Sequence, residues 1–279
     1  MHNNKRDNKY NTIGIIGFGF VGSAVAQGFS TLADIKIYDA DPVKSENTLE
    51  EVCKESEFIF ICVPTPIAED MSCDTTIVEK VIKDCSPYVH DTNKILIIKS
   101  TIPPGTTEFI KKLYPDIRIV FNPEFLTARC ARLDFINSAR IVLGGDPEDL
   151  CEVEKLYREK FPHTPIFWTD STSAEMVKYT ANCFFSVKVM FFNEIYQICE
   201  KLGIDYDEVK KMVLADGRIG NSHLDVPGHD GDFGIGGTCF PKDLNALMCK
   251  AIELGVSPNL LMAAWEKNLE VRKNRDWEK

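Results

Sequence analysis

One cysteine stands in a sequence context that favours chemistry. Cys239 lies in GGTCFPKD, residues 236–243. Pro241 suits the first turn of a helix, which places Cys239 just before a helix N-terminus and beside Lys242. A helix dipole and a neighbouring ammonium group both stabilise a thiolate. The motif therefore favours a nucleophile over a small buried loop residue, whereas we interpret the other cysteines as structural thiols.

A lysine and an asparagine four residues apart form the second candidate. Lys178 and Asn182 lie in AEMVKYTANCFF, and this spacing places them on one face of a helix. A desolvated Lys178 amine would be a good partner for an oxyanion. A lysine at the edge of a helix can equally extend its ammonium group to solvent. The spacing alone leaves both interpretations open.

A glycine-rich loop near the start predicts cofactor binding. GFGFVG, residues 17–22, follows an apolar run and opens a helical pattern. Such a loop brings backbone close to a pyrophosphate at a helix N-terminus. Asp39 ends the next apolar run, at a spacing suited to the adenosine ribose, and its charge would repel a 2′-phosphate. We therefore expect NAD rather than NADP, although Lys44 nearby works against this preference.

Further polar residues follow other apolar runs. Glu124 lies in NPEFL, Thr65 in CVPTP and Thr101 in KSTIPPG. In an open parallel sheet, ligands bind beyond the carboxyl ends of the strands, where these residues are expected. Each residue alone is also typical of a turn or a helix cap.

The elements that would position these residues follow from the alternation of apolar runs and amphipathic segments. Apolar runs occur at Thr12–Gly17, Ile35–Tyr38, Phe58–Val63, Lys94–Lys99, Ile117–Phe121, Arg140–Leu143 and Pro165–Trp168. Helical patterns occur at Val21–Ser30, Thr75–Val89, Thr106–Leu113 and Pro147–Lys160. This alternation predicts an α/β fold with a Rossmann-type, doubly wound parallel sheet. The predicted dinucleotide-binding domain covers residues 1–171.

The remaining residues, 172–279, are predicted to form a small all-helical domain. It begins with a long, largely apolar helix, Thr172–Lys201, with Thr172 and Glu175 as a capping box and Gly203 as a stop signal. A short helix, a glycine-rich loop and two more helices follow. A helix apolar around much of its circumference should be buried between domains or subunits.

Composition excludes several classes of function. The net charge of -10 disfavours general binding to nucleic acid or anionic membranes, and no apolar stretch is long enough to cross a bilayer. The ten cysteines include no C-x-x-C pair and no cluster with histidine at zinc spacing, so no metal site is expected. Because the polar start lacks a secretory signal, we expect reduced thiols and a cytoplasmic protein.

Seven motifs together carry a family resemblance. GFGFVG, CVPTP, KSTIPPG, NPEFL, AEMVKYTAN, DGRIGN and GIGGTCFPKD occur in this order over almost the whole chain. They resemble the UDP-glucose/GDP-mannose dehydrogenases, in which GGTCFPKD and NPEFL are the specific elements. The resemblance implies NAD-dependent, four-electron oxidation of a primary alcohol of a nucleotide-sugar, with UDP-glucose converted to UDP-glucuronate as the expected reaction.

The resemblance also implies a role for each catalytic candidate. Asp243, with Lys178 and a water, would help to remove the alcohol proton. Cys239 would hold the carbon as a thiohemiacetal and then as a thioester, while Lys178 and Asn182 stabilise the oxyanion. Glu124 would be the base in thioester hydrolysis, and Thr101 would position the water.

Binding residues follow from the same motifs. The implied cofactor contacts are Gly17, Gly19, Phe20, Val21, Gly22, Asp39, Lys44, Val63, Thr65, Ser100, Thr101 and Lys242. The implied substrate contacts are Glu124, Phe125, Leu126, Lys178, Asn182, Phe233, Gly234, Gly236 and Gly237, and Arg218 matches an arginine that reaches the neighbouring subunit's substrate. We therefore expect a homodimer formed through the long helix.

This sequence departs from the family pattern in three places. Ala128 stands where the family has a second acid that helps to hold the cofactor. The loop between Arg218 and Cys239 looks longer than in the best-known members, and the chain ends soon after Trp277. The expectation is a short form without the C-terminal domain that closes over the nucleotide.

Two other classes of function remain open. A two-electron 3-hydroxyacid dehydrogenase of the 6-phosphogluconate dehydrogenase type would share the layout and the Lys178/Asn182 spacing, but it would not need Cys239. A non-catalytic NAD-binding homologue would fit the expected absence of a third domain. The number of NAD⁺ consumed per product, and turnover by the chain alone, separate these alternatives.

Overall fold

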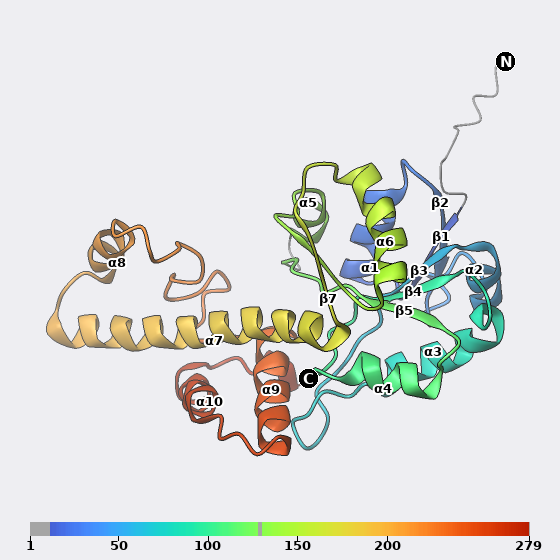
Figure 1. Ribbon diagram of the computed structural model, residues 1–279. Helices are drawn as coiled ribbons and strands as arrows, with labels where there is room; N and C mark the ends of the chain where they lie inside the picture. Colours follow the sequence, from blue (N-terminus) through green and yellow to red (C-terminus); the bar gives the residue numbers. More distant parts are fainter. Residues whose placement is uncertain (1–11, 128–129, 279) are drawn as a thin grey trace. The chain divides into compact units, whose positions relative to one another are not determined.

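A computed structural model describes residues 12–127 and 130–278 (Figure 1). The described residues fall into two compact units. The first comprises those up to Thr65 together with Asp74–Lys178, and the second comprises Pro66–Cys73 together with those from Tyr179 onward.

A seven-stranded sheet forms the centre of the first unit. In chain order its strands are β1 (Thr12–Ile16), β2 (Asp34–Tyr38), β3 (Phe58–Ile61), β4 (Ile95–Ile98), β5 (Arg118–Phe121), β6 (Ile141–Gly144) and β7 (Ile166–Thr169). They are arranged in the order β2-β1-β3-β4-β5-β6-β7. Residues of β3 and β4 are buried on both faces, which explains their continuous apolar sequences, FIFI and ILII.

Helices cover both faces of this sheet (Figure 1). One apolar core joins the sheet to α1 (Phe20–Phe29), α5 (Ala131–Ile136) and α6 (Pro147–Lys160). A second core joins the opposite face to α2 (Leu49–Glu55), α3 (Thr76–Val89) and α4 (Thr106–Leu113). The predicted doubly wound α/β fold is confirmed.

The sheet differs from the prediction in one connection and two helices. β6 pairs antiparallel to β5 through Phe121 and Gly144, whereas the other pairings are parallel. Hydrophobic periodicity reports which face of a strand is buried but not its direction, so the sequence pattern could not reveal this reversal. The short helices α2 and α5 were also not predicted.

The strand order creates a switch point between β1 and β3. β1 pairs with β2 on one side and with β3 on the other, and the chain leaves β1 and β3 toward opposite edges of the sheet. In open α/β sheets, ligands bind in the crevice at the carboxyl ends of such strands. Gly17 follows β1 directly at this point.

The long helix α7 (Ser171–Leu202) begins one residue earlier than predicted, and its cap is different. Asp170 accepts hydrogen bonds from the backbone N–H of Ser173 (2.8 Å) and from its hydroxyl (2.6 Å). Glu175 does not complete a box with Thr172. Instead, its buried carboxylate accepts from Gly105 N and from both the N–H and the hydroxyl of Thr107, at the start of α4. Burial raises the pKa of Glu175 to about 7.

The second unit is helical. Most of α7 packs there with α8 (Tyr206–Leu214), α9 (Phe240–Glu253) and α10 (Asn259–Val271), and the 3-10 helix Asp276–Glu278 follows. The short segment Pro66–Cys73 joins this unit, where Cys73 packs against Tyr179 and Ala246. Within the part of the chain that the structure describes, no helix is both long and apolar enough to span a membrane.

Candidate functional site

The glycine loop has the geometry of a phosphate cradle. Gly17 has a φ of 91°, and a Cβ on it would lie 2.7 Å from the Cys62 carbonyl oxygen. A Cβ on Gly22 would lie 2.0 Å from the Gly17 oxygen. By contrast, a Cβ on Gly19, the N-cap of α1, would meet nothing within 4 Å. The loop is therefore tightly packed against the protein and open at the helix N-terminus, where an anion binds favourably.

Asp39 lies beside this loop. One of its carboxylate oxygens accepts a hydrogen bond from Phe18 N at 2.6 Å, and the other accepts from Asp41 N at 2.8 Å. Lys44 lies within 3.5 Å of Asp41, with its side chain half exposed. These contacts hold an acid next to the glycine loop, and the first turn of α1 itself contains no acid. Both features fit the pyrophosphate and ribose of a dinucleotide.

The segments after β3 and β4 are joined by hydroxyl groups. The Ser100 hydroxyl donates to the Val63 carbonyl oxygen at 2.7 Å. The Thr65 hydroxyl donates to the Thr101 carbonyl oxygen at 2.9 Å. Thr65 and Ser100 are buried. Four residues predicted to contact the cofactor are thus brought together at the carboxyl ends of neighbouring strands.

A buried ion pair joins two predicted catalytic residues of the first unit. Lys178 Nζ lies 3.2 Å from Glu124 Oε2, and both side chains are almost fully buried. The second carboxylate oxygen of Glu124 accepts a short hydrogen bond from Leu126 N. The Phe125 ring lies 4.1 Å from the Arg140 guanidinium. A solvent-extended Lys178 is therefore wrong, because the side chain is buried against the Glu124 loop.

The second unit holds another buried polar cluster. Asn182 donates to Asp243 Oδ2 at 2.6 Å, and Lys242 donates to Asp243 Oδ1 at 2.5 Å. All three side chains are buried. Burial opposes protonation of Lys242, but Asp243, Cys73 and Cys239 together raise its pKa above the usual value. Lys242 is therefore a buried cation in the first turn of α9, one turn from Cys239, a placement that favours a thiolate.

Cys239 is the N-cap residue of α9, with Pro241 in the first turn, as the motif predicts. Its side chain is half-buried, and its sulfur lies 3.9 Å from the Thr238 hydroxyl. All ten cysteines are free and lie in the described ranges 12–127 and 130–278. The same ranges contain no group of three or more acid, cysteine or histidine side chains suited to a metal ion.

The loop leading to Cys239 is held by residues that the sequence did not identify. Gly234 N donates to Asn193 Oδ1, and Ile235 N donates to the buried Asn268 Oδ1. Gly237 N lies 3.0 Å from each Asp276 carboxylate oxygen. The buried Arg272 binds Asp230 and the carbonyl of Phe233, and a Cβ on Gly236 would strike its guanidinium. These partners come from α7 and from the end of the chain, too far away in sequence to be seen as a motif.

Two further positions were singled out in the sequence. Arg218 is exposed and pairs with Asp216 of its own chain at 2.5 Å. Ala128 lies outside the described residues.

Comparison with known proteins agrees with this architecture. Residues 36–161 match the NAD binding domain of the UDP-glucose/GDP-mannose dehydrogenase family, and residues 172–270 match the central domain of that family. The chain is 31% identical to UDP-glucose 6-dehydrogenase of Campylobacter jejuni, over 93% of this chain and 72% of that protein. The chain therefore belongs to the UDP-glucose/GDP-mannose dehydrogenase family.

Solved structures are similar over the same length. A UDP-glucose dehydrogenase from Pyrobaculum islandicum superposes with a TM-score of 0.84 at 26% identity, over 95% of this chain and 69% of that one. A UDP-D-ManNAc dehydrogenase from Pyrococcus horikoshii gives a TM-score of 0.81 at 25% identity, over 93% and 68%. The chain spans about half the length of several other curated relatives that it matches.

Proposed function

We propose that the protein is an NAD-dependent nucleotide-sugar dehydrogenase that oxidises a primary alcohol of the sugar to a carboxylate through a thioester on Cys239. The observation that carries this proposal is the half-buried thiol at the N-terminus of α9, with Lys242 as an electrostatic neighbour and Asp243 bound to both Lys242 and Asn182. The reaction consumes one alcohol, one water and two NAD⁺, and it forms one carboxylate, two NADH and three protons. NAD⁺, when bound, accepts a hydride in each oxidation.

The covalent steps are proposed to use Cys239, Asn182 and Asp243 together with Lys178. Asp243, together with Lys178 and a water, takes the proton of the alcohol as the first hydride leaves. The Cys239 thiolate then adds to the aldehyde carbon, forming a C–S bond and an oxyanion near the cationic Lys178 and the amide of Asn182. Loss of the second hydride leaves a thioester, and covalent attachment prevents escape of the aldehyde between the two oxidations.

Hydrolysis of the thioester needs a base, and Glu124 is proposed for that role. The water oxygen adds to the thioester carbon, and its proton passes to Glu124. The C–S bond then breaks, and Cys239 leaves as a thiolate. Thr101 would position the water. The proposed sugar-side contacts are those of the Glu124–Leu126 and Phe233–Gly237 segments.

Asp39 is expected to select NAD⁺ over NADP⁺. A 2′-phosphate would meet the carboxylate that Phe18 N and Asp41 N hold beside the glycine loop. The unmodified protein should favour NAD⁺ in kcat/KM by about tenfold or more, because like charges repel. Asp39→Ala should lower the ratio of kcat/KM for NAD⁺ to kcat/KM for NADP⁺. Asp41→Ala, which removes the acid beside Lys44, should leave this ratio unchanged. Equal kcat/KM for both cofactors in the unmodified protein would contradict this selection.

A homodimer is proposed through an apolar stripe on α7. Phe184, Phe191 and Ile198 follow one another at intervals of seven residues, which places them on one helix face. Their side chains are 62%, 55% and 53% exposed. An apolar stripe of this length is typical of an interface, and a two-fold dimer is the commonest closed arrangement. In such a dimer, Arg218 would reach the partner's substrate.

Sedimentation of the purified chain tests the dimer. Phe191→Glu should convert a dimer at micromolar concentration to a monomer, because it places a charge in an apolar interface. Leu113→Glu on α4, at a side chain that is 55% exposed, is the matched control and should leave the dimer intact. A fully active monomer of the unmodified chain would rule out both the interface and the shared arginine.

The substrate is proposed to be UDP-glucose, with UDP-glucuronate as the product. We also propose that residues 1–171 bind the cofactor, that residues 172–279 form the central domain, and that the protein is cytoplasmic.

A panel of nucleotide-sugars, assayed for NADH formation by the purified chain, tests the activity. UDP-glucose should give the highest kcat/KM, and a chain that forms no NADH with any member of the panel would overturn the proposed function.

A further inference from the structure

A lysine outside the catalytic set described above lies buried next to Glu124. Lys99 follows β4 directly and is 5% exposed. Its Nζ donates to Asn122 Oδ1 at 2.8 Å and lies 3.4 Å from the Asn122 carbonyl oxygen. Within the described parts of the chain, Lys99 forms no ion pair within 4 Å. A buried ammonium group whose hydrogen-bond partners are neutral is costly, so its presence calls for a reason.

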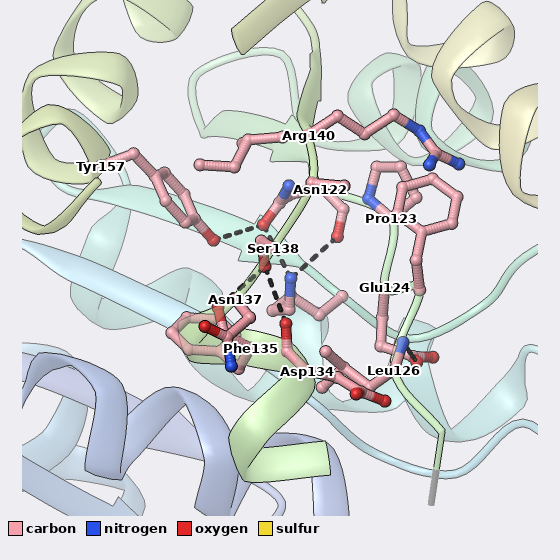
Figure 2. Close-up of a pocket in the computed structure, with 14 residues that line it drawn as sticks. Asn122, Pro123, Glu124, Leu126, Asp134, Phe135, Asn137, Ser138, Arg140 and Tyr157 are labelled. Atoms are coloured by element: carbon pink, nitrogen blue, oxygen red, sulfur yellow. Dashed lines mark hydrogen bonds between the residues drawn. The ribbon is translucent and has the colours of Figure 1, made fainter. Parts of the chain in front are cut away.

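Asn122, which binds Lys99, is held from several directions (Figure 2). Its Oδ1 also accepts from the Tyr157 hydroxyl at 2.5 Å, and its Nδ2 donates to the Val142 carbonyl oxygen at 2.8 Å. Its backbone N donates to the Ile98 carbonyl oxygen at 2.9 Å. Asn122 is therefore tied to β4, β6 and α6, and the chain reaches Glu124 two residues later. Lys99, Asn122, Glu124 and Tyr157 line one cavity of about 310 Å³.

The groups that act electrostatically on Lys99 are the Cys62 thiol, the Glu124 carboxylate and the Lys178 amine. Burial lowers the pKa of Lys99 to about 8, with Glu124 and Cys62 opposing the shift and Lys178 adding to it. Burial raises the pKa of the Cys62 thiol to about 12 and that of Tyr157 well above its usual value, so both are neutral. The charged groups beside Lys99 are Glu124 and Lys178, and Asp134 and Arg140 also line the cavity. Among the described residues, Glu124 forms its ion pair with Lys178.

We propose that Lys99 is a positioning residue for Glu124: it fixes the Asn122–Glu124 segment through Asn122, and it supplies a positive charge beside Glu124 when Lys178 turns to the oxyanion of the substrate. This inference rests on the proposed role of Glu124 as the base in thioester hydrolysis. Without Lys99, Glu124 would take the proton of the water with Arg140, whose guanidinium packs against the Phe125 ring, as the remaining cation that lines the cavity.

The expected result concerns the hydrolytic step alone. Lys99→Gln removes the charge and keeps a donor for Asn122. The hydride transfers should proceed, while hydrolysis slows by about tenfold and an adduct on Cys239 accumulates. A positive charge favours the ionised form of a neighbouring carboxylate base. The acidic limb of the pH profile for hydrolysis should therefore move upward by about one pH unit.

Two variants separate charge from packing. Tyr157→Phe removes a hydrogen bond to Asn122 and keeps the Lys99 charge, so the acidic limb should stay in place even if the rate falls. Lys99→Met replaces the ammonium group by apolar atoms of similar length, and it should shift the limb as Lys99→Gln does. It also serves as the second charge-free variant if Lys99→Gln does not fold. Circular dichroism and adduct mass measured on each variant complete the set.

The outcomes distinguish this inference from the proposed function. A folded charge-free variant with an unmoved acidic limb overturns the role of Lys99. Equal slowing of the hydride transfers and of hydrolysis, without an adduct, also overturns it, because it shows a structural role only. Failure of the proposed role of Glu124 appears elsewhere, as a Glu124→Gln variant that accumulates no adduct, and failure of the proposed function appears as a panel of nucleotide-sugars that gives no NADH.

Discussion

Cys239→Ser is expected to lower kcat by roughly 10³-fold or more while leaving NAD⁺ affinity nearly unchanged. A serine hydroxyl keeps the shape of the side chain, but it is a far weaker nucleophile than a thiolate stabilised by a helix N-terminus and Lys242. The measurements are steady-state NADH formation and a direct titration with NAD⁺.

Cys249→Ser is the matched control. Cys249 also lies on α9 and is half-buried, and its sulfur lies 3.7 Å from the Asp70 carbonyl oxygen. This variant should retain full activity. Full steady-state activity in Cys239→Ser would instead exclude a covalent intermediate on that sulfur.

Glu124→Gln is expected to lower kcat by about 10²-fold to 10³-fold and to leave a covalent adduct on Cys239. Glutamine keeps the size of the side chain but cannot take the proton of the hydrolytic water, so the reaction should stop at the thioester. Intact-protein mass spectrometry after incubation with UDP-glucose and NAD⁺ should show the added mass, and peptide mapping should place it on Cys239.

Glu148→Gln, at an exposed position in the first turn of α6, is the control and should turn over normally without an adduct. An inactive Glu124→Gln variant with no adduct would move the role of Glu124 to a step before hydrolysis. Loss of the ion pair with Lys178 would then be the simplest cause.

Much of the first unit could be predicted because its signals are local. The apolar strands β3 and β4 and the glycine loop before α1 are each continuous in sequence, and their physical reasons are short-range. The reversal of β6 was not predictable, because direction depends on where the connection returns. Glu175 shows the same limit: its spacing to Thr172 is that of a capping box, yet tertiary structure directs its carboxylate to the N-terminus of α4.

The candidate site divides in the same way. The motifs identified the candidates Glu124, Lys178, Asn182, Asp243 and Cys239. They did not reveal that Glu124 pairs with Lys178, 54 positions away, or that Asn182 pairs with Asp243, 61 positions away. Lys99 stood inside KSTIPPG without an assigned role. A charged residue directly after an apolar strand was the available signal, but only the structure shows that Lys99 is buried.

The ratio of NADH formed to sugar oxidised by the purified chain tests the four-electron reaction most directly. With UDP-glucose as limiting substrate, two NADH should form for each UDP-glucuronate, and no free aldehyde should be trapped by an added amine or hydrazine. A ratio of one, with an aldehyde or ketone as the product, would contradict the thioester mechanism and show a two-electron dehydrogenase that does not need Cys239.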